Sequence, residues 1–214
     1  MNKLQRFFNG GGKKLHLFLV LLLSVAGMSK TFATDFYIVI DGSLWGFNYI
    51  DTENHYVEVA SGPNKSTVDI PGTVNQNLID YTVIGIGTKA FDNKNKLSSV
   101  TFPNTVTYFG DYAFRKCSSL VSIEIPSSVT SIGEYAFNSC TSLNSISIPN
   151  SVTSLGEYAF WNCTSLSSIT LSNQLTTLES HTFYNCNNLP NFNSNFTDVS
   201  MAKPTTQGGY LTLV

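Results

Sequence analysis

The sequence predicts a solenoid that is mainly β, with short helical turns and with parallel sheets made of stacked repeats. Three observations predict it. Residues 97–188 repeat with a period of 23 residues, phenylalanine and cysteine recur in one fixed frame, and each repeat begins with apolar residues that alternate with polar ones. A 23-residue unit cannot bury its own apolar strand face, whereas stacked copies form one continuous core from equivalent positions. The recurring residues are Phe91, Phe114, Phe137, Phe160 and Phe183, and Cys117, Cys140, Cys163 and Cys186.

Residues 1–33 are expected to be a signal peptide. Four basic residues precede an apolar stretch, residues 15–25, that is too short to span a bilayer comfortably. Cleavage near Ala33 is favoured over cleavage after Gly27, and a retained membrane anchor or a buried core helix is the competing interpretation. The mature chain is therefore expected to be secreted or on the cell surface, with no membrane span.

Signal cleavage changes the charge balance. It removes five basic residues and no acidic one, which leaves 7 of the 12 basic residues against all 14 acidic ones, a net charge of −7. A surface of this sign repels a phosphate backbone, so nucleic acid is not an expected partner.

Residues 34–65 are expected to form an N-terminal cap with β-strands. Strands are predicted at residues 36–40 and 55–59, with the turn residues Asp41 and Gly42 between them. A cap is needed because the first repeat would otherwise expose its sheet edges and its core.

The repeats occupy residues 66–189. The first unit, 66–96, is irregular: Pro71 and Phe91 are 20 residues apart, whereas Pro126 and Phe137 are 11 apart, so this unit contains an insertion of about nine residues. The regular units are residues 97–119, 120–142, 143–165 and 166–188.

Each regular unit is predicted to contain two strands and one helical turn. In the unit 120–142, a half-buried strand with a period of two surrounds Glu124 and ends at Pro126, which lacks a backbone donor. A second extended piece covers residues 129–132, and Gly133 then frees the backbone for a bend. One helical turn would place the following Ala-Phe pair and the cysteine on one side. The phenylalanines should therefore stack as a ladder along the solenoid axis.

Residues 190–214 are expected to be an irregular C-terminal tail or a truncated cap. In the last unit, Ser172, Glu179 and Thr182 replace the proline, the glycine and the alanine of the repeat, and the pattern decays beyond Leu189. The tail either closes the array or is cut from a longer chain, and the sequence leaves both alternatives open.

The repeat resembles the BspA-like branch of leucine-rich repeats over residues 66–189. The pattern that carries the resemblance is L-x-S-I-x-I-P-x-S-V-T-S-I-G-E-Y-A-F-x-x-C. The resemblance implies a solenoid of leucine-rich-repeat type on a surface protein. It also implies adhesion to host matrix proteins such as fibronectin and fibrinogen, or to neighbouring bacteria. The array is short for the family, and no surface-anchoring module is recognisable after it.

The four cysteines occupy the same inward position of four repeats, next to the core phenylalanine. We therefore expect buried thiols that pack as small apolar residues. A disulfide between neighbouring repeats stays possible on distance grounds, and a metal site is the least favoured alternative because a ladder does not converge on one point. No metal site and no cofactor is predicted.

A stripe of rings precedes the Ala-Phe pair in each repeat, and carboxylates come just before it. The carboxylates of Asp111, Glu134 and Glu157 are best explained by the positive end of a helix dipole. The rings either cover the outer edge of the core or form a contact surface, since aromatic residues are enriched at interfaces. The stripe, a candidate partner-binding surface, consists of Tyr112, Tyr135, Tyr158 and His181.

The open face of the first strand offers a second candidate partner-binding surface. It is rich in hydroxyl groups and nearly uncharged, so it could donate hydrogen bonds to an extended ligand, although the family's consensus explains it equally well. Its candidate residues are Ser122, Glu124, Ser145 and Ser168.

No set of residues with the pattern of a catalytic site occurs, so the chain is not expected to be an enzyme. The favoured function is a binding and adhesion module for a protein ligand, host extracellular matrix included. The alternative is a non-binding structural spacer or a repeat element that associates with itself.

Overall fold

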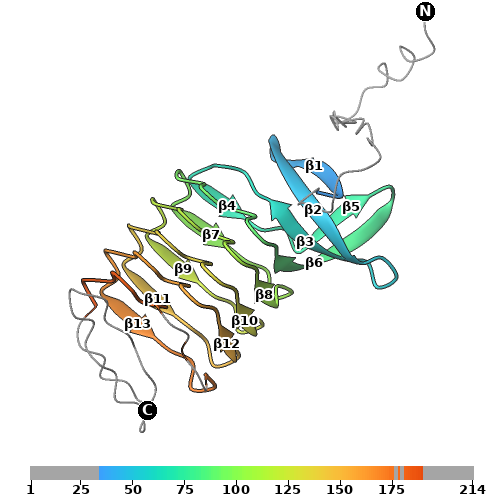
Figure 1. Ribbon diagram of the computed structural model, residues 1–214. Coiled ribbons are helices and arrows are strands. Elements are labelled where there is room, and N and C mark those ends of the chain that lie inside the picture. The colour runs from blue at the N-terminus through green and yellow to red at the C-terminus, as the bar shows by residue number, and fades with distance from the viewer. Residues whose placement is uncertain (1–33, 176–177, 179–180, 190–214) are drawn as a thin grey trace, which may run out of the picture.

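The computed structural model describes residues 34–175, 178 and 181–189 and contains strands and turns in that part of the chain, with no helix. The strands stack along one axis into a solenoid of parallel strands, and an antiparallel cap lies at the N-terminal end (Figure 1). The predicted fold class is confirmed. The predicted signal peptide, residues 1–33, and the predicted C-terminal tail, residues 190–214, lie outside the described residues.

The first side of the solenoid is built from one three-residue strand per repeat. Each of these strands has exposed end residues and a central residue that is buried, or half-buried in the last strand, as the alternation in the sequence predicts. The first two of these strands pair in parallel with each other, and the last three pair in parallel as a separate sheet. The strands are β4 (Thr67–Asp69), β7 (Ser99–Thr101), β9 (Ser122–Glu124), β11 (Ser145–Ser147) and β13 (Ser168–Thr170).

The second side continues from the cap into the repeats as one eight-stranded sheet. Its repeat strands have only two residues, shorter than the extended piece predicted at residues 129–132. Its strands are β1 (Phe36–Ile40), β2 (Ser43–Asp51), β3 (Tyr56–Ser61), β5 (Thr73–Gln76), β6 (Ile79–Ile86), β8 (Tyr108–Phe109), β10 (Ser131–Ile132) and β12 (Ser154–Leu155).

The cap is a set of antiparallel strands whose last member pairs with the array. Strands β1 and β2 form a hairpin whose turn residues, Asp41 and Gly42, have φ values of +50° and +73°, which suits the tight hairpin turn. Strand β3 then pairs in parallel with β6, so the cap and the repeats share one sheet. The hydroxyl of Tyr108 also donates a 2.7 Å hydrogen bond to Glu58 of β3, and burial together with Glu58 raises the pKa of Tyr108.

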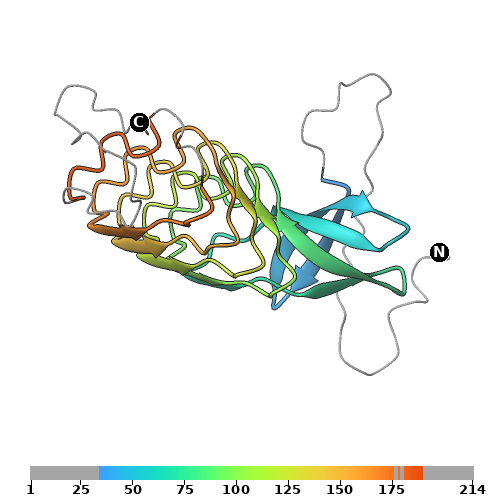
Figure 2. The same cartoon turned by 90° about the horizontal axis from the view of Figure 1, so that it is seen from below.

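The insertion in the first repeat forms a second hairpin. Strands β5 and β6 pair antiparallel, and the turn between them has positive φ at Asn77 and Leu78. The side chain of Leu78 is almost fully exposed there. The hairpin extends from the solenoid at the cap end (Figure 2).

The core is a ladder of parallel phenylalanine rings, as the sequence predicts. Ring centroids of successive repeats lie 5.3–5.5 Å apart with interplanar angles of 4–8°. Trp45 of the cap meets Phe91 edge to face at 6.3 Å and so covers the first ring. The rings in this ladder are those of Phe91, Phe114, Phe137, Phe160 and Phe183.

The third segment of each repeat is not the predicted helical turn. Tyr135 and Ser139 have φ values of +54° and +60°, and the equivalent residues of the other repeats have the same conformation, which a right-handed helix does not allow. The amides of Tyr135, Phe137 and Ser139 donate instead to carbonyl groups of the next repeat, at 2.7–3.0 Å. The amides of Asn138 and Cys140 donate three residues back within the repeat, to Tyr135 and Phe137. The segment is therefore a series of turns bonded to the next repeat and not a helix.

Candidate functional site

The aromatic stripe lies on the third segment, where the left-handed conformation sets its direction. Tyr112, Tyr135, Tyr158 and His181 all have φ between +54° and +60°. The amide of Tyr112 donates to Glu134 at 2.8 Å, and the amide of Tyr135 donates to Glu157 at 3.0 Å. The rings of Tyr112 and Tyr135 are thus held by a backbone that is bonded to the next repeat.

The four rings stack face to face. Centroid distances are 4.9 Å from Tyr112 to Tyr135, 4.6 Å from Tyr135 to Tyr158 and 5.0 Å from Tyr158 to His181, with interplanar angles of 6–10°. The rings are half-buried. Their faces cover one another, so their edges face outward. The stripe thus packs the outside of the core and also presents an aromatic surface.

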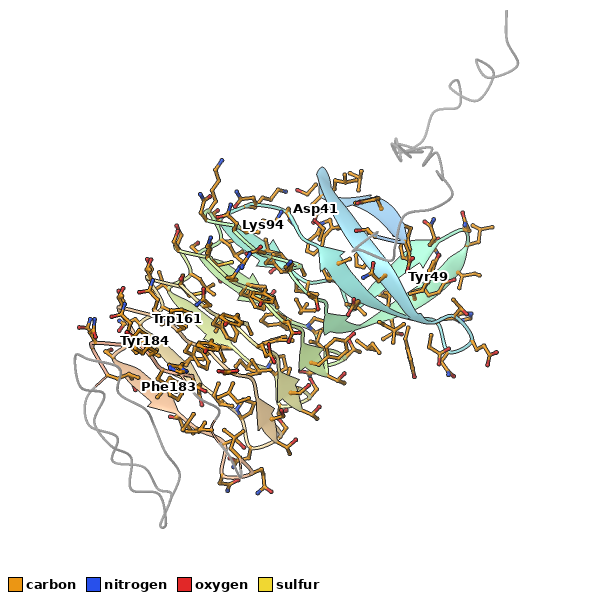
Figure 3. The ribbon with its side chains drawn as sticks, viewed as in Figure 1. Asp41, Tyr49, Lys94, Trp161, Phe183 and Tyr184 are labelled. Carbon is orange, nitrogen blue, oxygen red and sulfur yellow. The ribbon has the colours of Figure 1, made fainter. Side chains whose placement is uncertain are left out.

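Sequence reasoning missed the residues that widen this stripe. Trp161 packs against Tyr158 with centroids 5.1 Å apart, and Tyr184 meets Trp161 edge to face at 5.9 Å. Figure 3 shows Trp161 and Tyr184 on the same edge of the solenoid. Both residues follow the core phenylalanine directly, a position that holds different residue types in different repeats. The repeat period could not identify these residues, because the residue type at this position changes from repeat to repeat. We call Tyr112, Tyr135, Tyr158, His181, Trp161 and Tyr184 the aromatic edge.

A cationic residue ends the aromatic edge on the side of the cap. The guanidinium of Arg115 lies 4.8 Å from the ring centroid of Tyr112, within the range of a cation–π contact. Arg115 also forms two hydrogen bonds with Asp92, at 2.7 and 2.8 Å, and this contact raises the pKa of Arg115. The charge of Arg115 is thus held in place beside the rings.

A shallow groove of about 500 Å³ runs along the aromatic edge. Its lining combines aromatic rings, amide and hydroxyl groups and two cations, which suits contact with a polar, extended ligand. Partial burial, followed by the neighbouring Tyr112 and Glu157, raises the pKa of Tyr135. The lining residues are Tyr112, Arg115, Lys116, Tyr135, Asn138, Ser139, Trp161 and Asn162.

The row of carboxylates beside the stripe needs another explanation than a helix dipole, because the third segment contains no helix. Asp111 accepts a 2.9 Å hydrogen bond from the backbone amide of Glu134 in the next repeat. This contact satisfies an amide that the turn would otherwise leave without a partner. For Asp111 the role is therefore structural.

The serine surface is a separate row on the first side of the solenoid. Ser122, Ser145 and Ser168 pair directly across β9, β11 and β13, and their side chains are exposed, as is that of Glu124. They lie on the strand side, whereas the aromatic edge lies on the third segment. The fold thus brings the serines together with one another and the tyrosines together with one another, but it does not join the two rows. Either row as a binding surface remains a prediction.

The four cysteines are buried and free, as expected for thiols that pack in the core. Each thiol donates a hydrogen bond to the carbonyl oxygen of the core phenylalanine in the preceding repeat, for example from Cys140 to Phe114 at 3.1 Å. The carbonyl oxygen of Phe114 also accepts the amide of Cys117 at 3.2 Å, so the thiol supplies its second hydrogen bond, which alanine could not do. Burial raises the pKa of Cys117 to about 12 and holds the pKa of Cys140 well above its ordinary value.

We expect these thiols to be unreactive in the folded chain, because only a thiolate attacks a thiol reagent. At about pH 8.5, where half of a free thiol is ionised, labelling should be no faster than unfolding. Mass spectrometry of timed samples would measure it, with the denatured chain as the control that labels at once. Rapid labelling of Cys140 without unfolding would contradict the burial seen here.

Two further findings hold for the described part of the chain. It contains no group of three or more histidine, cysteine, aspartate or glutamate residues that could hold a metal ion. It also contains no helix long and apolar enough to cross a membrane.

The family model described as a BspA type leucine rich repeat region matches residues 84–202 in six copies. No curated protein matches the chain. The matched region includes the aromatic edge and most of the stacked strands, so the family match and the geometry concern the same part of the chain.

Solved structures share this fold. The leucine rich repeat protein of T. pallidum is 27% identical, with a TM-score of 0.62, over 68% of this chain and 66% of that one. A leucine-rich repeat protein from Bacteroides ovatus is 30% identical, with a TM-score of 0.53, over 68% of this chain and 44% of that one. A leucine rich cell surface protein from Faecalibacterium prausnitzii is 22% identical, with a TM-score of 0.55, over 86% of this chain and 62% of that one, and shows the fold alone. The chain spans less than two thirds of the length of each.

Proposed function

Because this chain belongs to the family of BspA-type leucine-rich repeat proteins, we propose that it is a secreted or cell-surface binding module that engages a protein ligand through its aromatic edge. The ligand belongs to a host extracellular matrix or to a neighbouring cell. The N-terminal segment directs export, and the repeats present the contact surface. The proposal includes no catalytic step.

The observation that carries the proposal is the continuous aromatic edge over four repeats. Tyrosine, tryptophan and arginine are the residues most enriched in the energetically dominant parts of protein interfaces. Here Trp161 and Arg115 flank a stack of half-buried rings. Because the backbone beneath is bonded from repeat to repeat, the edge loses little conformational entropy when a ligand binds.

Trp161 offers the sharpest test, because the equivalent residues of the other repeats show which residue types the fold accepts at that position. The preceding repeat has Asn138 there, so Trp161→Asn should leave the fold intact while it removes the largest ring. We expect affinity for the protein ligand to fall at least tenfold, which corresponds to about 1.4 kcal/mol. Biolayer interferometry of residues 34–214 against matrix proteins and mucins would measure it. Replacement of the stacked tyrosines by alanine is less informative, because stacking contributes about 0.5–1.5 kcal/mol per pair to stability.

The matched control is Ser145→Asn on the serine surface, a change to the same residue type at an exposed position. Binding should be unaffected by Ser145→Asn. If Ser145→Asn weakens binding and Trp161→Asn does not, the serine surface is the contact surface and the proposal is wrong about the edge. A well-folded chain that binds no protein, and whose mass in light scattering rises with concentration, would instead favour the self-associating spacer.

A further inference from the structure

The basic residues of the mature chain are gathered in one region. Residues 34–214 contain seven lysines and arginines, and six of them lie between residues 65 and 116. The acidic residues are spread along the whole chain, which has a net charge of −7 after residue 33. The six basic residues are Lys65, Lys89, Lys94, Lys96, Arg115 and Lys116.

The fold brings these residues to one corner of the first repeats. The amide of Lys96 donates to the side chain of Asn64 at 3.0 Å, which places the segment that contains Lys65 beside it. On the other side, the amide of Asn93 donates to the carbonyl of Arg115 at 2.7 Å. Three segments of the chain, around residues 64, 93–96 and 115, are therefore neighbours in the fold. Figure 3 shows Lys94 at the end of the solenoid that carries the cap. We call Lys65, Lys94, Lys96 and Lys116 the basic corner.

The basic corner carries a net positive charge on an otherwise acidic protein. Lys65, Lys96 and Lys116 are exposed, and Lys94 is half-buried. Within residues 62–66, 89–98 and 112–121 of the sequence, Asp92 is the one acidic residue, and it pairs with Arg115. Asp41 of the cap hairpin lies beside the corner, because the ammonium group of Lys65 donates a 3.1 Å hydrogen bond to the carbonyl oxygen of Asp41. The four lysines of the corner outnumber this one carboxylate. A patch of this kind raises the local concentration of anions and guides anionic ligands to it.

The basic corner is continuous with the groove along the aromatic edge. Lys116 belongs to the corner, and together with Arg115 it lines the groove. Beyond them the groove offers amide groups, a hydroxyl group and the ring of Trp161. Sugar rings pack their C–H faces on aromatic side chains, and their hydroxyl groups exchange hydrogen bonds with amides. An acidic peptide would use the cations and the amides as well, but it lacks the C–H faces of a sugar ring that pack on an aromatic side chain, so polyglutamate is the competing ligand in the test below.

We propose that the basic corner and the groove bind a linear anionic polysaccharide of the sulfated type that extracellular matrices carry. The sulfate groups contact Lys96 and Lys116, and the sugar units extend along the groove toward Trp161. Successive repeats are about 4.8 Å apart, a distance similar to the length of one sugar unit in an extended chain. The inference rests on the proposed function in that it takes the aromatic edge as a contact surface.

The experiment uses residues 34–214 and a size-defined heparin oligosaccharide as the probe. Isothermal titration would compare it with the desulfated oligosaccharide and with polyglutamate of similar charge. We expect saturable binding of the sulfated probe, little binding of the other two, and an affinity that falls as salt rises. Equal binding of polyglutamate would mean that the corner takes acidic peptides, and equal binding of the desulfated probe, which keeps its carboxylates, would mean that the sulfate groups are irrelevant. Either result, or no binding, would overturn the proposal.

Paired variants separate local contact from overall charge. Lys96→Gln with Lys116→Gln should weaken binding at least tenfold and reduce its dependence on salt. Thr73→Asp with Ser127→Asp, both at exposed positions away from the corner, changes the net charge by the same amount and should have little effect. If both pairs of variants lose the same amount of affinity for the oligosaccharide, the loss is explained by net charge alone and the inference is wrong. Trp161→Asn should weaken binding without a change in its salt dependence.

The two proposals fail in different ways. If Trp161→Asn weakens binding to a protein ligand while no polysaccharide binds, the polysaccharide inference is wrong and the proposed function stands. If the polysaccharide binds as described but no protein ligand does, the aromatic edge serves polysaccharide recognition and the proposed protein-binding function is wrong.

Discussion

Phe137→Ala is expected to lower the free energy of unfolding by about 3–5 kcal/mol, the usual cost of removing a buried phenylalanine. Phe137 is fully buried and stacks between Phe114 at 5.4 Å and Phe160 at 5.3 Å. Phe109 of the second side also meets it edge to face at 6.1 Å. Truncation would open a cavity that neighbours from three repeats border, and these cannot close in because hydrogen bonds hold the repeats at a fixed spacing.

Urea denaturation followed by circular dichroism would measure this loss. Phe183→Ala is the comparison within the same ladder. Phe183 stacks on Phe160 at 5.5 Å, and its side chain is slightly exposed, so a smaller loss is expected. A loss below about 1 kcal/mol for Phe137→Ala, less than typical large-to-small changes in a core, would mean that the ladder is not the core of the fold.

Gly133→Ala is expected to destabilise the array by about 3 kcal/mol, at the upper end of the cost of overpacking. A Cβ atom at Gly133 would lie 2.6 Å from the amide nitrogen of Asp111 and 2.7 Å from the carbonyl carbon of Gly110. Both atoms belong to the backbone of the preceding repeat, so no side-chain rotation relieves the clash. The two repeats would have to move apart, and the hydrogen bond from Gly133 to Phe109 at 2.8 Å would lengthen.

Gly72→Ala is the matched control for this effect. The nearest atom to an added Cβ there is the side chain of Pro103 at 3.5 Å, an ordinary contact distance. Thermal unfolding of the two variants should give a much lower melting temperature for Gly133→Ala than for Gly72→Ala. Similar melting temperatures would show that the spacing between repeats can adjust, and that a glycine at position 133 is not needed for close stacking.

The third segment of the repeat shows why part of the prediction was wrong. Ala136, Phe137 and Cys140 have the spacing of one helical turn, and all three are buried as that spacing implies. Burial alone does not distinguish a helix from the observed turn, because both turn these three side chains inward. The helix and the observed turn differ in their backbone hydrogen bonds to the next repeat. The spacing of buried residues within one repeat cannot predict hydrogen bonds between repeats.

The aromatic edge was predicted in part for the same reason. Tyr112, Tyr135 and Tyr158 recur in frame, so the repeat period placed them in one row. Trp161 and Arg115 occupy a position without a recurring residue type, and only the fold brings them against that row. The basic corner likewise joins Lys65 to Lys96, which are far enough apart in the sequence that only the bond between Lys96 and Asn64 shows them to be neighbours.

The sequence by itself determined the solenoid, the frame of its repeats, the phenylalanine ladder and the inward position of the four cysteines. These follow from one physical requirement, that equivalent apolar residues must be buried against their copies in the next repeat. The tertiary structure decided the left-handed turn, the hydrogen bonds from the thiols to the phenylalanine carbonyls, and the position of the groove next to the basic corner. Each of these depends on distances between repeats, which are fixed by hydrogen bonds and close glycine contacts that no single repeat contains.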